Sequence, residues 1–142
     1  MDVRCLYDLA EQHNIEVVSF SMCENGSVSF MTNGGNCYIG MDRAVQDGSA
    51  QERVHLSHEI GHCMTGSFYN RYATADNRQR HENVADKWAI RKLVPVDELD
   101  QAVAEGYTEV WELAERFGVT EQFMKKAICL YVHGNVAEEL YF

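Results

Sequence analysis

The chain has 142 residues, 46% of them hydrophobic, and it carries 22 acidic against 12 basic side chains, for a net charge of −10. This length and apolar content exclude a disordered chain and predict a single domain with its own core. No apolar run approaches the roughly 20 residues of a membrane span, and the N-terminus has no signal-peptide core. We therefore expect a cytoplasmic protein with no membrane partner.

The first predicted elements are a short helix within residues 3–14 and three β-strands. Apolar residues repeat at helical spacing in the first segment, and the β-rich runs are 15–22, 27–31 and 37–41. Asn25-Gly26, between the first two runs, is a type I′ hairpin signal, so the runs predict an antiparallel meander. We expect an α+β fold in which this small three-stranded antiparallel sheet packs on the next helix. The third strand is predicted to be an edge strand, which can pair with another extended chain.

The next predicted element is an amphipathic helix. Residues 49–52 have the capping-box pattern Ser-Ala-Gln-Glu, which marks its start. Leu56, Ile60 and Cys63 fall on one side of the helical wheel and form its apolar face. The other side is left for polar groups.

The polar side of this helix carries a metal-binding pattern, His58-Glu59-Ile60-Gly61-His62. An α-helix turns about 100° per residue, so the two histidines lie roughly 40° apart and can bind one ion. Glu59 lies beside the ion without binding it, where it can act on a metal-bound water. A catalytic zinc site also needs a third protein ligand.

A second helix supplies a candidate for that ligand. Glu82 and Asp86 lie one turn apart on one face of a helical pattern that begins twenty residues after His62. Glu82 can complete the ligand set, and Asp86 can accept the second ring N–H of a zinc-bound histidine. The alternative is that both are solvated helix charges paired with Lys87 or Arg78.

Residues 56–63 and 82–89, running on to Leu93-Val94-Pro95, together resemble the ImmA/IrrE family of zinc metallopeptidases, which are HExxH enzymes of the gluzincin-like type. The resemblance extends from about residue 15 to about residue 130. One departure is that the basic or threonine-rich run before the motif is reduced to residues 53–55. The resemblance implies a specific protein substrate, a helix-turn-helix transcriptional repressor of a mobile element, prophage or stress operon.

The ligand set predicts a hydrolytic mechanism with one Zn²⁺ per chain. Zinc bound by His58, His62 and Glu82 would lower the pKa of its water to about 7. Glu59 would act as general base and then as general acid. A further donor must stabilise the oxyanion or contact the substrate, and the candidates are His81, Tyr72, Tyr69 and His55.

The segment 66–81 joins the two metal-bearing helices and is predicted to be a lid or substrate-contacting loop. Basic residues are frequent from here to the end of the second helix: Arg71, Arg78, Arg80, Lys87, Arg91 and Lys92. They could steer a substrate, or they could only solvate a helix face.

After Pro95 the chain is acidic and helical, with predicted helices from Asp97, over 108–117 and over 121–131. With Gly118 at the turn between them, the last two predicted helices resemble a helix-turn-helix. We expect no contact with nucleic acid, because phosphate binding needs a basic face. The chain is thus predicted to be one domain, residues 1–142, with a catalytic core over 1–95 and a helical extension over 96–142.

Five cysteines, an odd number without a CxxC pair, predict reduced and mostly buried thiols rather than disulfides or thiolate ligands. They are Cys5, Cys23, Cys37, Cys63 and Cys129. Cys63 follows a predicted ligand but is assigned to packing.

Two functions fit these residues. The first is a zinc-dependent endopeptidase that cleaves the repressor. The alternative is a zinc-binding regulatory protein that relieves repression by binding the repressor without proteolysis. Glu59 favours the enzyme, because a purely structural zinc site gains nothing from a base beside its ligand.

Overall fold

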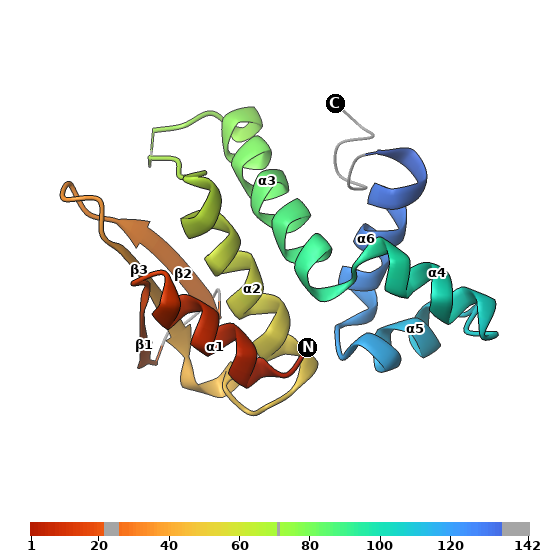
Figure 1. The fold of residues 1–142 in the computed structure, drawn as a ribbon. Helices are drawn as coiled ribbons and strands as arrows, with labels where there is room; N and C mark the ends of the chain where they lie inside the picture. The colour runs from red at the N-terminus through yellow and green to blue at the C-terminus, as the bar shows by residue number, and fades with distance from the viewer. Residues whose placement is uncertain (22–25, 71, 135–142) are drawn as a thin grey trace.

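The computed structural model describes residues 1–21, 26–70 and 72–134. The fold is α+β and mostly helical, with a small mixed sheet (Figure 1). In chain order its elements are α1 (Val3–Gln12), β1 (Glu16–Phe20), β2 (Ser27–Met31), β3 (Cys37–Asp42), a 3₁₀ turn (Arg43–Val45), α2 (Ala50–Thr65), α3 (Ala75–Leu93), α4 (Val96–Ala104), α5 (Val110–Phe117) and α6 (Glu121–His133).

The sheet is mixed, so the predicted antiparallel meander is wrong. Its strand order is β1-β3-β2, with β1 parallel and β2 antiparallel to β3. The reason is burial: Ile39 and Met41 of β3 are fully buried, and a strand that buries its side chains against the core takes the centre of the sheet. The strand predicted at the edge is therefore central. Asn25, half of the predicted hairpin signal, lies outside the described residues.

Strand β2 forms one edge of the sheet. The Asp42 amide donates to the Gly26 carbonyl and the Thr32 amide donates to the Asn36 carbonyl, both at 2.9 Å, so even-numbered residues along β2 bond to β3. In an antiparallel pair, successive residues direct their backbone N–H and C=O groups alternately toward and away from the partner strand. The odd-numbered residues of β2 therefore direct theirs away from β3. Ser27 and Ser29 thus present backbone donors and acceptors at the free edge.

Helix α2 packs into the core through Leu56 and Ile60, which are fully buried. The predicted capping box forms only in part. Ser49 stands at the N-cap without a side-chain cap bond, while Glu52 accepts hydrogen bonds from the Gly48 amide at 2.8 Å and from the Tyr7 hydroxyl at 2.7 Å. The carboxylate therefore stabilises the start of α2 and also ties it to α1.

Helices α2 and α3 approach closely because α2 carries Gly61 at the contact. A Cβ atom on Gly61 would lie 2.7 Å from the carbonyl oxygen of Ala85, closer than real carbon atoms come. Both positions are completely or nearly completely buried. The close approach brings the polar side chains of α3 within reach of those on α2.

The predicted thiol state of Cys37 and Cys63 is wrong, because these two residues form a disulfide. Their Cα atoms are 6.0 Å apart, and the bridge joins central strand β3 to α2 one residue after His62. Cys5 and Cys129 are free thiols, but neither is buried as predicted, because Cys5 is exposed and Cys129 is only partly buried; Cys23 lies outside the described residues. The pairing depends on the sheet topology, which the sequence did not reveal.

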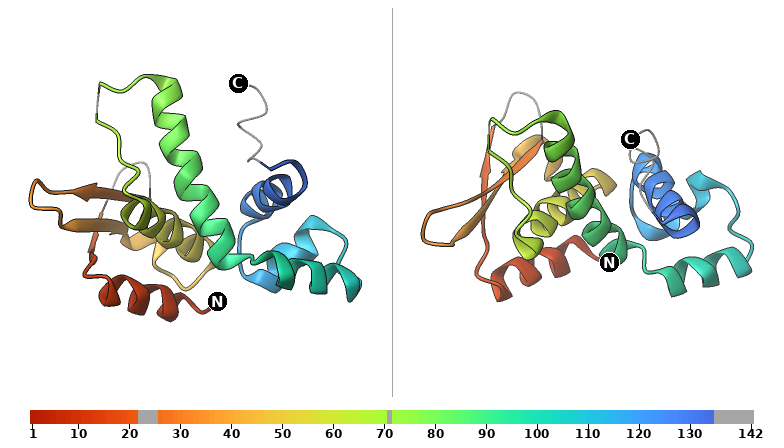
Figure 2. Two further views of the ribbon diagram at one scale, coloured as in Figure 1. Left: turned by 45° about the horizontal axis from the view of Figure 1, so that its top comes forward. Right: turned by 90° about the horizontal axis from the view of Figure 1, so that it is seen from above.

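The three predicted C-terminal helices are present as α4, α5 and α6, and Gly118 ends α5 with a φ of 67°. They lie across α3 from the sheet (Figure 2). The Arg53 guanidinium donates to the Gly118 carbonyl at 3.2 Å, and the Tyr131 hydroxyl donates to the Val94 carbonyl at 2.7 Å. Within the described residues, no helix has the length and apolar character needed to cross a membrane.

Candidate metal centre

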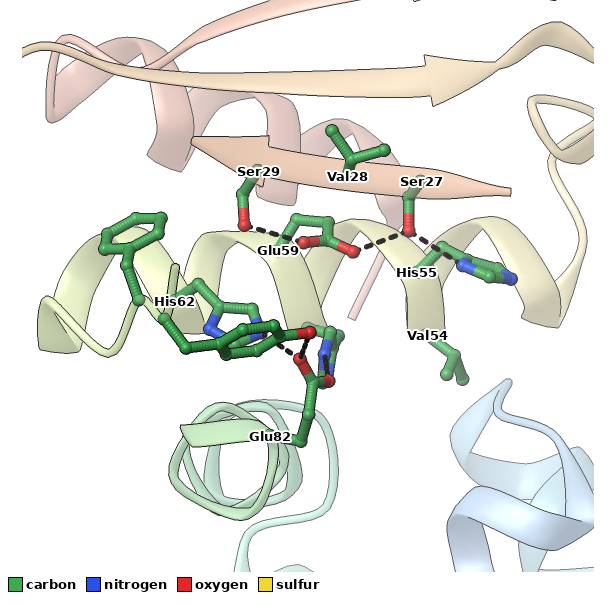
Figure 3. A pocket seen from close by; sticks show the side chains of 11 residues that line it. Ser27, Val28, Ser29, Val54, His55, Glu59, His62 and Glu82 are labelled. Carbon is green, nitrogen blue, oxygen red and sulfur yellow. Dashed lines mark hydrogen bonds and ion pairs between the residues drawn. The ribbon is translucent and has the colours of Figure 1, made fainter. Parts of the chain in front are cut away.

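A cleft of about 530 Å³ opens where β2, α2, the loop after α2 and α3 meet (Figure 3). One wall is strand β2 and the floor is α2. Its lining residues are Ser27, Val28, Ser29, Val54, His55, His58, Glu59, His62, Phe68, Tyr69 and Glu82. Three of these have the chemistry of metal ligands.

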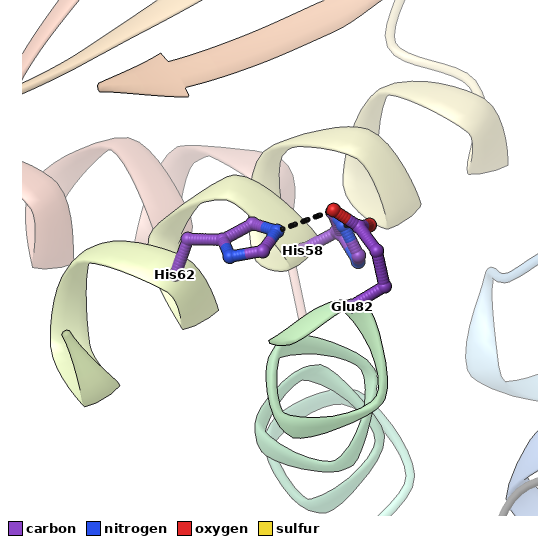
Figure 4. Close-up of side chains that lie close together, drawn as sticks. All are labelled: His58, His62 and Glu82. Carbon is purple, nitrogen blue, oxygen red and sulfur yellow. Dashed lines mark hydrogen bonds and ion pairs between the residues drawn. The ribbon is translucent and has the colours of Figure 1, made fainter. Parts of the chain in front are cut away.

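His58, His62 and Glu82 come together in the cleft, and their donor atoms all lie within 4.8 Å of one another (Figure 4). The Nε2 atom of His58 is 2.7 Å from one oxygen of Glu82, and the Nε2 atom of His62 is 3.2 Å from the other. Neighbouring donors in a tetrahedral zinc site are roughly 3.3 Å apart, given bonds of about 2.0–2.1 Å. Two imidazoles and one carboxylate therefore fit a zinc-type ion both in chemistry and in spacing.

Each histidine is oriented by a hydrogen bond from its other ring nitrogen. The Nδ1 atom of His58 lies 2.8 Å from Asp86, and the Nδ1 atom of His62 bonds to the carbonyl of Ser67. These acceptors require a proton on Nδ1, which leaves Nε2 of each ring as a lone-pair donor facing Glu82. The tautomers needed for metal binding are thus set by the protein.

In the absence of a metal, the same groups hold a proton. Burial disfavours the charged form of His58, but hydrogen bonds to Asp86 and Glu82 outweigh it and raise its pKa to about 10. Burial tends to raise the pKa of Glu82, yet the two imidazoles lower it well below its usual range. The site therefore concentrates negative charge that a cation, either a proton or a metal ion, must balance.

Asp86 is also bonded to the C-terminal helices. Its second oxygen accepts a hydrogen bond from the Lys126 ammonium at 3.1 Å, and its side chain is only 10% exposed. Burial raises the pKa of Asp86, but the bonds to His58 and Lys126 lower it overall. A cation on α6 thus helps to keep the carboxylate that orients His58 ionised.

Glu59 is held on the side of the cleft formed by β2. Figure 3 shows its carboxylate between Ser27 and Ser29, whose hydroxyls each donate to one oxygen at 2.8 Å. Its side chain is almost completely buried. Ser27 also lies 2.9 Å from Nδ1 of His55, and its only proton goes to Glu59, so His55 must donate to it.

Of the four predicted oxyanion or substrate residues, Tyr69 and His55 line the cleft. The Tyr69 hydroxyl donates to Glu82 at 3.0 Å, and burial, followed by the charge of Glu82, raises its pKa. Burial lowers the pKa of His55, which favours its neutral form. His81 contacts Tyr69 at 6.2 Å between ring centroids and does not line the cleft, and Tyr72 is 79% exposed outside it.

The predicted loop over 66–81 is shorter than expected, because α3 begins at Ala75. Thr74 caps that helix by accepting a hydrogen bond from the Asn77 amide, a signal that the sequence contained. Phe68 and Tyr69 of the remaining loop do line the cleft, and the Phe68 ring lies 5.9 Å from that of His62.

Sequence reasoning missed several cleft residues. Ser27 and Ser29 are two positions apart in β2 and so lie on the same face of the strand, and this spacing was the only sequence signal that connects them. Val54 supplies an apolar wall of the cleft, and Lys126, which does not line the cleft, acts through Asp86. Nothing local to these residues marks them as part of a site.

A helix with two histidines four positions apart, joined by a carboxylate from the next helix, defines the class of HExxH metal centres. The chain belongs to the family of the IrrE N-terminal-like domain, Peptidase M78, whose model matches residues 10–128. It is thus a member of a metallopeptidase family. A search of curated proteins gave no match.

Proposed function

We propose that the protein is a zinc-dependent endopeptidase that cleaves a specific protein partner, a helix-turn-helix transcriptional repressor. The observation that carries the proposal is that one cleft holds the triad His58, His62 and Glu82 together with Glu59. The resemblance to ImmA/IrrE proteins supports the choice of substrate. The net charge of −10 also favours a basic, DNA-binding protein as the partner.

Zinc held by the triad would supply a water of lowered pKa and polarise the scissile carbonyl. Glu59 accepts the proton of the attacking water and passes it to the leaving nitrogen. The hydroxyls of Ser27 and Ser29 keep its carboxylate at the cleft wall while it does so. Tyr69, whose hydroxyl already reaches Glu82, is the best-placed donor to the oxyanion.

Strand β2 supports a polypeptide substrate rather than a small one. Its free edge exposes backbone groups of Ser27 and Ser29, and both residues line the cleft. An extended substrate can add to this edge as a further strand, which places its backbone alongside the triad. Val54 and Phe68 would then receive apolar side chains near the scissile bond.

The alternative function is regulation by zinc-dependent binding without cleavage. The buried hydrogen bonds of Glu59 argue against it, because such a protein has no need to hold a carboxylate beside the metal ligands. Repressor cleavage would take place in the cytoplasm, where thiol systems reduce most disulfides. The Cys37–Cys63 bridge is then expected to be open for part of the lifetime of the protein.

The test is Glu59→Gln, compared with Glu98→Gln, an exposed carboxylate on α4. Each variant is co-expressed with a candidate helix-turn-helix repressor and a reporter gene under its control, and repressor fragments, reporter activity and bound zinc are measured. Glu59→Gln is expected to keep zinc but to leave the repressor intact and active. If it relieves repression as well as Glu98→Gln does, the regulatory alternative replaces the peptidase.

A further inference from the structure

Three basic residues in the second half of α3 lie away from the metal cleft. Lys87, Arg91 and Lys92 line a second hollow of about 500 Å³, and this hollow shares no residue with the cleft. It lies between α3, the end of α1 and the end of α2. These three residues are therefore not placed to steer a substrate to the triad.

The hollow has an apolar floor beside its cations. Val84 and Trp88 follow the same α3 stripe as Lys87 and Arg91, at the i, i+3, i+4, i+7 spacing of one helix face. Met64 at the end of α2 faces them, and Met64 and Val84 are each 38% exposed. The Lys92 ammonium lies 6.0 Å from the centre of the Trp88 ring.

The charge of the hollow is opposite to that of the protein. The chain has a net charge of −10, yet no carboxylate is among the residues lining this hollow, which also include His13. A concave surface with an apolar floor and a cationic rim is complementary to an amphipathic helix with acidic flanks. Nucleic acid would not use the floor, and a membrane binds protruding rather than recessed apolar groups.

We propose that this hollow, lined by Met64, Val84, Lys87, Trp88, Arg91 and Lys92, is a docking site for an acidic amphipathic helix of a protein partner. One bulky apolar side chain of that helix enters between Met64 and Trp88, and its carboxylates pair with Arg91 and Lys92. The site goes beyond the proposed peptidase function. Its occupancy does not depend on a metal ion or on Glu59.

The test uses two fluorescein-labelled helical peptides with leucine at i, i+3, i+4 and i+7, one with glutamate and one with lysine on the remaining face. The full-length protein is titrated against each peptide by fluorescence anisotropy, with and without zinc. The glutamate peptide is expected to bind in both conditions, more weakly as salt rises, and the lysine peptide is not.

Matched variants locate the binding. Arg91→Glu with Lys92→Glu is expected to weaken binding of the glutamate peptide by at least about tenfold. Arg80→Glu with Lys125→Glu, at exposed positions outside the hollow, makes the same change of net charge, from −10 to −14, and is expected to leave binding within about twofold. Met64→Ser, also at an exposed position, tests the apolar floor without changing charge and is expected to weaken binding.

Three results would overturn the proposal. The first is equal binding of the lysine and glutamate peptides. The second is an equal loss in the two charge-reversed pairs. The third is that the protein binds phosphatidylglycerol vesicles more tightly than the glutamate peptide and that this binding is lost when Arg91 and Lys92 are replaced. That result would assign the hollow to a lipid surface instead.

Discussion

Opening the Cys37–Cys63 bridge is expected to destabilise the fold by an amount that follows from its position in the chain. The bridge closes a loop with a sequence separation of 26 residues. Chain-entropy arguments give about 3.5 kcal/mol at 25 °C for a loop of this length. In a protein of this size that corresponds to a fall in the melting temperature of roughly 10 °C.

The assay is urea unfolding of the wild type with and without a phosphine reductant, so that the sequence and its packing stay the same. The variant Cys37→Ser/Cys63→Ser is expected to show no response to the reductant. The variant Cys5→Ser/Cys129→Ser, which also removes two sulfurs, should respond as the wild type does.

Thiol counting under denaturing conditions completes this test. Oxidised protein should show two thiols fewer than the five of the reduced chain. Five thiols in protein that has not met a reductant would show that the bridge does not form. A bridge whose reduction changes the free energy of unfolding by less than about 1 kcal/mol would refute the entropic reasoning.

Further predictions concern the metal-bearing helices. Gly61→Ala should destabilise the protein by about 1–3 kcal/mol and weaken zinc binding, because its Cβ would lie 2.7 Å from the backbone of α3. Urea unfolding and competition with a zinc chelator measure the two effects. Gly34→Ala, where the added Cβ would have no contact under 3.8 Å, should change neither. In the metal-free protein, protonated His58 contributes stability that is complete below pH 6.5 and lost as the pH rises through about 10. Melting temperatures in EDTA should therefore fall across that window, and a flat profile would contradict this. Lys126→Met should cost on the order of 1–2 kcal/mol, because the buried Asp86 carboxylate loses one of its two charged hydrogen-bond donors. Equal losses for exposed Lys125→Met would show that the bond contributes nothing.

The three candidate metal ligands could be predicted from the sequence because they lie on two successive helices and two of them are only four residues apart. His58 and His62 share a face of any helix that forms there, and Glu82 lies on the next helix of the chain. The structure brings the three donors within 4.8 Å. Their roles in zinc binding and catalysis stay predictions until metal content and activity are measured.

The topology of the sheet could not be predicted in the same way. A turn signal near Gly26 suggested that β1 and β2 pair, but pairing is decided by which strand buries most surface against the helices. Ile39 and Met41 made β3 that strand, and β1 joined it in parallel from the other side. The disulfide followed from that arrangement, since it brings β3 against α2.

Residues that act through tertiary contacts were also beyond local reasoning. Ser27 and Ser29 become partners of Glu59 only once β2 lies along α2, and serine in a strand carries no chemical signal of its own. The basic residues Lys87, Arg91 and Lys92 could be seen in the sequence, but their grouping beside Met64 depends on where α2 ends.

The bond between Lys126 and Asp86 has a practical consequence for dissecting the protein. A shortened chain that ended at Pro95 would contain all three candidate ligands, yet Asp86 would lose the ammonium at 3.1 Å and the Val94 carbonyl would lose the Tyr131 hydroxyl. Such a fragment would expose the apolar side of α3 that now packs on α6. We expect it to aggregate or to bind metal poorly, so that its inactivity would say nothing about the chemistry of the intact site.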